Sequence, residues 1–139
     1  MPTLEELLRA SLKGANERFD SAKNTLHAAV VEAAKAVEAA TGGKATIRLE
    51  EVSKKEAETR YSLEVIMKGT DEVRELEIFS VSSNGFPIRA LAEGGGAYNQ
   101  FNTEESIVKY FEKLASNPES PLVRYLAFII RNSDEPIPF

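Results

Sequence analysis

The sequence predicts an α+β fold with a long N-terminal helix or helix pair, a four-stranded antiparallel meander and two C-terminal helices. Residues 3–41 contain no proline and one glycine, Gly14, and their apolar side chains recur every three or four positions. Residues 44–91 change to a period of two, and Asn84-Gly85 is a strong hairpin-turn signal. Residues 102–132 return to helical spacing.

The first helical region has an apolar stripe that is longer than one small domain needs. An unbroken helix over this region would be about 57 Å long, whereas a compact chain of this size has a radius of gyration of about 14 Å. We therefore expect the helix either to overhang its own domain or to break at Gly14. An overhanging apolar stripe is exposed to water unless a partner covers it. A second copy of the chain is the simplest partner, so the pattern predicts a homodimer. Its predicted interface residues are Leu8, Leu12, Phe19 and Leu26.

Four strands are expected at residues 44–52, 59–68, 72–81 and 86–91, joined by short turns. The third strand is irregular, because Leu76 and Ile78 fall on one face while Phe79 and Val81 fall on the other. Either a β-bulge shifts the register or both faces are partly buried. We favour the second interpretation, with the N-terminal helix on one face and a partner or the C-terminal helices on part of the other.

Two C-terminal helices follow a segment that contains Gly94, Gly95 and Gly96. Asn102 or Thr103 is expected to cap the first helix, with Glu105 completing a capping box, and Asn117-Pro118 ends it. Ser120-Pro121 begins the second helix, which ends near Asn132. We expect a single domain over residues 1–133 and a tail over residues 134–139, which contains two prolines.

Composition excludes several classes of function. The net charge is −5 and no segment is strongly basic, which argues against nucleic acid and anionic membranes as partners. The chain has no cysteine, so disulfides and thiolate sites are impossible. The N-terminal residues are acidic rather than basic, and no apolar run has the length of a membrane span, so we expect a cytoplasmic protein.

Catalytic chemistry has little support in the sequence. His27 is the only histidine, which removes most acid–base, metal and triad arrangements. Adjacent glutamate pairs point in different directions, and no metal-binding motif occurs. Four arginines on the strands could form an anion-binding row, but pairing with the neighbouring glutamates is the favoured interpretation. The arginines are Arg48, Arg60, Arg74 and Arg89, and the glutamates are Glu50, Glu64, Glu75 and Glu77. We therefore predict no enzyme activity, no cofactor and no metal.

The favoured function is a non-catalytic cytosolic protein-binding module that acts as a homodimer, of the adaptor, chaperone, immunity or inhibitor type. The segment after the glycines has the composition of a contact loop. Its predicted partner-binding residues are Tyr98, Asn99, Gln100 and Phe101. The alternative is a domain that senses a small ligand or nucleotide, with a site near the loop from Gly94 to Gly96. An exposed apolar patch would favour the first function, and a closed polar pocket would favour the second.

Overall fold

The computed structural model describes residues 1–92 and 96–132 as an α+β fold with one antiparallel sheet. The sheet is a five-stranded meander in the order β1-β2-β3-β4-β5. The prediction of four strands is therefore wrong by one strand at the C-terminal edge, whereas the α+β class and the meander are confirmed. The elements are α1 (Leu4–Ala40), β1 (Ala45–Lys54), β2 (Glu58–Met67), β3 (Val73–Ser82), β4 (Gly85–Leu91), β5 (Ala97–Phe101), α2 (Glu104–Ser116) and α3 (Pro121–Arg131).

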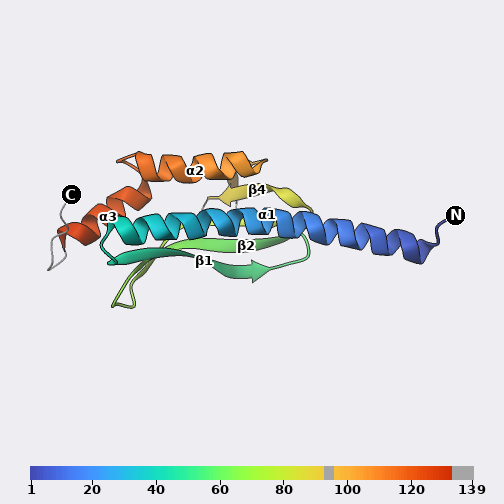
Figure 1. Ribbon diagram of the computed structural model, residues 1–139, viewed down its shortest axis with the longest axis horizontal. Coiled ribbons are helices and arrows are strands. Elements are labelled where there is room, and N and C mark those ends of the chain that lie inside the picture. Colours follow the sequence, from blue (N-terminus) through green and yellow to red (C-terminus); the bar gives the residue numbers. More distant parts are fainter. Residues whose placement is uncertain (93–95, 133–139) are drawn as a thin grey trace.

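Helix α1 is unbroken through Gly14, so the overhang is the correct one of the two expectations. Thr3 caps its start by accepting a hydrogen bond from the backbone N–H of Glu6 at 3.2 Å. The helix ends at Thr41, and the chain then turns through Gly42 and Gly43, whose φ angles of 60° and 82° favour glycine. The N-terminal part of α1 projects beyond the sheet (Figure 1).

Helices α1 and α2 pack on the same face of the sheet, and the core lies between them and the strands. Phe79 on β3 is completely buried and lies against Phe111 and Tyr110 of α2, with ring centroids 6.4 and 5.5 Å apart. Leu26 of α1 is also completely buried. The C-terminal helices therefore lie on the same side as α1. Of the two covers expected for the opposite face, the C-terminal helices are wrong, and a partner stays a prediction.

A β-bulge in β3 explains its irregular pattern. Leu63 pairs with Glu77 and Glu64 pairs with Glu75, so Leu76 is the extra residue on the β3 side. The extra residue restores the alternation beyond it, and Phe79 lies on the helix-covered face. The register shift at a β-bulge is therefore the correct explanation of the pattern, and the favoured one, burial of both faces, is wrong as its cause.

The fifth strand occupies part of the segment expected to be a loop. Residues from Ala97 to Gln100 are exposed, so they lack the alternating burial that identifies a strand in a sequence. Backbone pairing with β4 and the buried side chain of Phe101 hold the strand in place. Residues 93–95, with Gly94 and Gly95, and the tail expected over 134–139 lie outside the described residues.

Helices α2 and α3 are joined as one bent helical unit. Thr103 caps α2, but the reciprocal bond of the capping box comes from Ser106 and not from Glu105. Ser120 caps α3 by accepting from the N–H of Val123, and its hydroxyl donates to the carbonyl of Leu114 at 2.6 Å. This side chain therefore fixes the bend between the two helices.

Candidate functional site

The first candidate surface is the N-terminal part of α1, residues 4–15, which we call the arm. The sheet ends beneath α1 at Gly85, whose Cα lies against the backbone of Arg18: a Cβ atom there would lie 2.3 Å from the Arg18 carbonyl oxygen. N-terminal to this contact the helix has no strand below it (Figure 1). The arm therefore exposes four leucines to solvent: Leu4, Leu7, Leu8 and Leu12.

The four predicted interface residues divide between the arm and the core. Leu8 and Leu12 are each 62% exposed and lie on the arm. Phe19 is partly buried and packs against the core, and Leu26 has none of its side chain exposed. Only Leu8 and Leu12 are thus open to a partner, together with the two other arm leucines that the sequence analysis did not single out.

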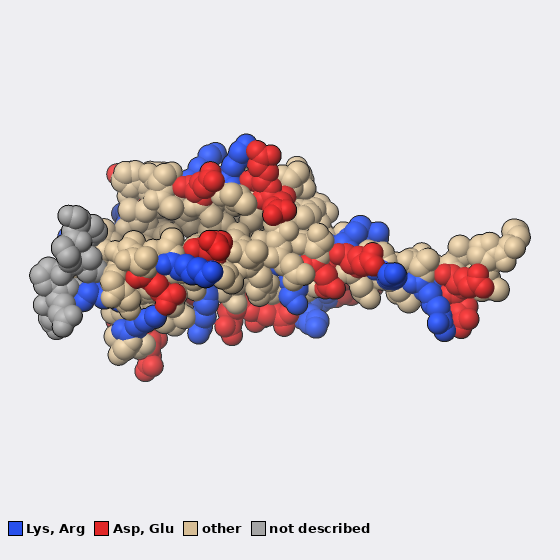
Figure 2. All heavy atoms as spheres, viewed as in Figure 1, with Lys and Arg blue, Asp and Glu red and all other residues tan. Residues whose placement is uncertain are grey.

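The second candidate surface is an apolar groove of about 830 Å³ between the C-terminal half of α1, α2 and α3, which we call the groove. In Figure 2 the surface between α1 and α2 is largely tan, with charged side chains along its margins. Alanines of α1 form one wall, and larger apolar side chains of α2 and α3 form the other. The main lining residues are Ala28, Ala29, Ala33, Ala36, Ala40, Val108, Phe111, Leu122, Leu126 and Ile130.

The groove results from the alanine-rich composition of α1. Val37 and Val30 are buried between α1 and the sheet, while Ala36 and Ala28 are exposed on the neighbouring side of the helix. Because an alanine side chain is a single methyl group, it leaves the space towards α3 unfilled. The sequence analysis describes one apolar stripe along this helix and does not predict the groove. The sequence signal for the groove was the absence of any large apolar residue on the side of α1 where these alanines lie.

The predicted contact loop lies on the edge strand β5. Tyr98, Asn99 and Gln100 are exposed, whereas Phe101 is only 4% exposed and packs against Phe79 and Tyr110. A partner can therefore reach the first three residues and not Phe101. The ring of Tyr98 is open to solvent, but its hydroxyl donates a hydrogen bond to Glu77.

Glu77 is a buried carboxylate, and the expectation that it pairs with a strand arginine is wrong. It is 8% exposed and accepts hydrogen bonds from the hydroxyls of Tyr98 and Tyr110, the latter at 3.3 Å. Burial raises the pKa of Glu77, and the two tyrosine hydrogen bonds oppose that shift. Burial also raises the pKa of both tyrosines, so their hydroxyls remain protonated donors. In the sequence, the irregular apolar pattern of β3 marks the bulge next to Glu77 and could have indicated its position.

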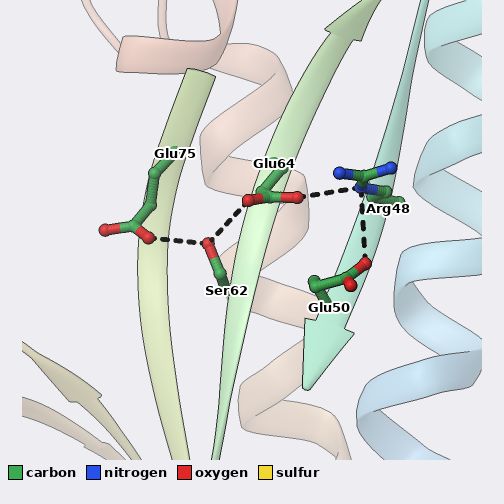
Figure 3. Close-up of polar contacts among 5 residues, drawn as sticks. All are labelled: Arg48, Glu50, Ser62, Glu64 and Glu75. Carbon is green, nitrogen blue, oxygen red and sulfur yellow. Dashed lines mark hydrogen bonds and ion pairs between the residues drawn. The ribbon is translucent and has the colours of Figure 1, made fainter. Parts of the chain in front are cut away.

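The opposite face of the sheet carries a polar network across three strands (Figure 3). Arg48 on β1 contacts Glu64 at 2.8 Å and Glu50 at 3.6 Å. Ser62, which is completely buried, donates to Glu75 at 2.7 Å and lies 3.5 Å from Glu64. Hydrogen bonding to Glu64 raises the pKa of the Arg48 guanidinium. The charge of Arg48 is therefore paired with glutamates inside the sheet, in agreement with the predicted pairing.

Two other arginines of the predicted row are also engaged. Arg60 pairs with Glu58 at 2.6 Å, and the guanidinium of Arg74 lies 4.8 Å from the ring centroid of Tyr125 in α3. The second contact is a cation–π interaction on the helix-covered side. Arg48, Arg60 and Arg74 therefore make separate contacts and do not form one anion-binding row.

His27 packs edge-on against Tyr61, with ring centroids 5.8 Å apart. Its Nε2 atom has no hydrogen-bond partner within the described part of the chain. Burial, with a smaller contribution from Lys23, lowers the pKa of His27, which favours the neutral ring. Within residues 1–92 and 96–132, no three histidine or acidic side chains are grouped so that they could hold a metal ion.

Comparison with known proteins gives no relative for this chain: no protein family, no curated protein and no solved structure matches it. Among the described residues, no helix combines the length and the apolar character needed to cross a membrane. The roles proposed for the arm, the groove and the exposed edge of β5 therefore rest on their geometry.

Proposed function

We propose that this protein is a non-catalytic protein-binding module that acts as a homodimer through the arm. The observation that carries the proposal is the exposure of four leucines on one continuous helix. Full burial of a leucine side chain stabilises by about 1.5–3 kcal/mol, so four of them in each of two copies offset a large part of the cost of association.

The helical state of the arm is a second argument for a partner. A helical end of about three turns has marginal stability in water when nothing packs against it. Exposed apolar patches of this kind typically mark contact surfaces. A second copy is the simplest partner, because one symmetric interface covers both arms at once.

The homodimer is tested by light scattering across micromolar concentrations. We expect a mass twice that of the 15.3 kDa chain. Leu8→Asp should dissociate the dimer without unfolding the chain, since Leu8 makes no contribution to the core. Ala10→Asp adds the same charge at another exposed position of the arm and should leave the dimer intact. A monomer at all concentrations, or equal dissociation by both variants, would contradict the proposal.

The exposed edge of β5 is the surface that we propose for a different protein partner. Tyr98, Asn99 and Gln100 offer an aromatic ring and two amides on a strand whose outer edge has no neighbour among the described strands. Edge strands and exposed aromatic side chains are common features of contact surfaces. Tyr98→Ala should weaken such a complex by about 1 kcal/mol or more.

A small apolar ligand in the groove is the second candidate function. The groove has the volume of a typical ligand pocket and an almost wholly apolar lining. Such a ligand would be a hydrocarbon chain or ring rather than a nucleotide. An environment-sensitive apolar dye that binds the chain stoichiometrically and is displaced by fatty acids would support this function.

A further inference from the structure

We propose that the arm of each copy lies in the groove of the other copy, so that two chains exchange their N-terminal helical ends. This inference rests on the proposed homodimer and names the surface that receives the arm. Within the part of the chain that the structure describes, no other element covers the apolar arm or the apolar groove. A single type of contact, made twice, covers all four surfaces in a closed pair.

The dimensions and side chains of the two surfaces are complementary. Residues 4–15 span about 18 Å as a helix, and α2, with 13 residues, spans about 20 Å. The arm carries large side chains, Leu8 and Leu12 among them, while the α1 wall of the groove carries alanines. Large side chains from one helix pack closely where a facing helix carries small ones.

Some of the charges around the two surfaces are complementary, since cations of the arm could meet glutamates of the groove. The groove is bordered by Glu32, Glu104 and Glu112, and the last two make no ion pair within the described residues. The arm carries Arg9 and Lys13 together with Glu5 and Glu6, so its formal charges cancel. Among the described residues, the ion pairs of the two cations are exposed contacts of 3.4 and 3.9 Å along the same helix. Such pairs are weak and exchange readily for contacts with a partner. Of the described residues that border the groove, Arg131 is the one cation.

Direct pairing of the two arms is the main competing arrangement. It would cover the leucines of both arms but would leave both grooves open to water. An amphipathic helix from a different protein, or a small apolar ligand, could instead occupy the groove. The exchange is favoured because its occupant, an exposed apolar helix segment of matching length, is already present in the chain.

Cysteine cross-linking distinguishes these arrangements, because the natural chain contains no cysteine. Leu8→Cys places a thiol on the arm, and Ala36→Cys places one in the groove. The two positions lie about 42 Å apart on the same helix, so a bond between them must join different copies. We expect mixed chains to cross-link through a short bifunctional thiol reagent. Each variant alone should cross-link at least tenfold more slowly.

Matched controls make each outcome decisive. Ala10→Cys, mixed with Ala36→Cys, tests random collision and should react at least tenfold more slowly than Leu8→Cys. If Leu8→Cys alone forms the fastest cross-link, the arms pair with each other and the exchange is wrong. If the chain scatters light as a dimer without either cross-link, the exchange is also wrong but the homodimer stands. A monomer by scattering contradicts both proposals.

Complementation gives an independent test that does not depend on thiol geometry. Leu8→Asp removes a working arm, and Ala36→Trp fills the groove at an exposed position. Each variant alone should dimerise at least tenfold more weakly than the natural chain. An equimolar mixture should recover part of the affinity, because one arm and one groove remain intact in each mixed pair. Folded variants, as judged by thermal melting, that fail to recover affinity on mixing contradict the exchange.

Discussion

The two halves of α1 have the same apolar spacing but opposite surroundings. From Phe19 to Val37 the stripe is packed on the sheet, and Leu26 is completely buried. On the arm, Leu8 and Leu12 are more than half exposed, although they continue the same face. The contact between Gly85 and Arg18 marks the boundary. Helical periodicity thus identifies a side that requires cover, but it does not identify which molecule supplies that cover.

The largest expected effect comes from truncating a leucine in each half. Leu26→Ala should lower the free energy of unfolding by about 2–5 kcal/mol at every protein concentration, since it creates a cavity in the core. Leu8→Ala should lower only the part of the unfolding free energy that dimerisation adds, and this part increases with protein concentration. Urea denaturation at low and high protein concentration measures both. Equal losses that are independent of concentration would show that the arm packs within its own chain.

The boundary itself is tested by two glycines with similar backbone conformations. Gly85 and Gly69 have φ angles of 91° and 83°, but only Gly85 lies against another element. Gly69→Ala should cost about 1–2 kcal/mol, the cost of a left-handed alanine. Gly85→Ala should cost clearly more, because α1 must move away from the β3–β4 turn. Equal thermal melting temperatures would show that this contact does not hold α1.

Glu77 and Glu58 lie on opposite faces of the sheet, and their opposite pKa shifts predict opposite effects of pH on stability. The pKa of Glu77 is raised, so its contribution to stability is full below the ordinary glutamate pKa of 4.5 and is lost as pH rises through the folded value. Glu77→Gln should therefore gain stability relative to the natural chain as pH rises towards neutrality. Melting temperatures at several pH values test this sign.

Glu58, on the opposite face, provides a control of opposite sign. Its pKa is lowered, first by the hydrogen bond from Ser80 and then by Arg60, so its contribution is present above pH 4.5 and is lost as pH falls. Glu58→Gln should be less stable than the natural chain near neutrality, and the difference should shrink in acid. The same slope for both variants would contradict the opposite directions of the two pKa shifts.

The smallest expected effect on stability comes from removing one hydrogen bond of the polar network around Ser62. Ser62→Ala removes the hydroxyl that donates to Glu75 and should cost about 1 kcal/mol. Ser83→Ala, at an exposed position in the β3–β4 turn, should change stability by less than about 0.5 kcal/mol. Chemical denaturation of both variants provides the comparison, and equal losses would show that the network does not stabilise the sheet.

Local patterns were sufficient to predict most of the fold. Strand alternation and the Asn84-Gly85 turn identified four strands, and Thr103 and Ser120 marked the starts of the C-terminal helices. The fifth strand was missed because its residues alternate too little in burial, and pairing with β4 defines it. The capping partner of Thr103 was also wrong, since Ser106 makes the reciprocal bond in place of Glu105.

The candidate surfaces were predictable only in part. The leucines of the arm follow from periodicity and length, so Leu8 and Leu12 could be named from the sequence. The groove could not, because it depends on where α2 and α3 lie relative to the alanines of α1. Glu77 was assigned to the wrong kind of partner, since one extra residue in β3 turns it towards Tyr110.

The unbroken course of α1 has a consequence for how this surface can change. In a continuous helix each inserted residue turns everything before it by about 100° and moves it by about 1.5 Å. One residue added between Ala15 and Arg18 would therefore direct the leucines of the arm to a different side, while seven would nearly restore their direction. The number of residues in this short segment, and not only their identity, sets the direction in which the protein presents its apolar end.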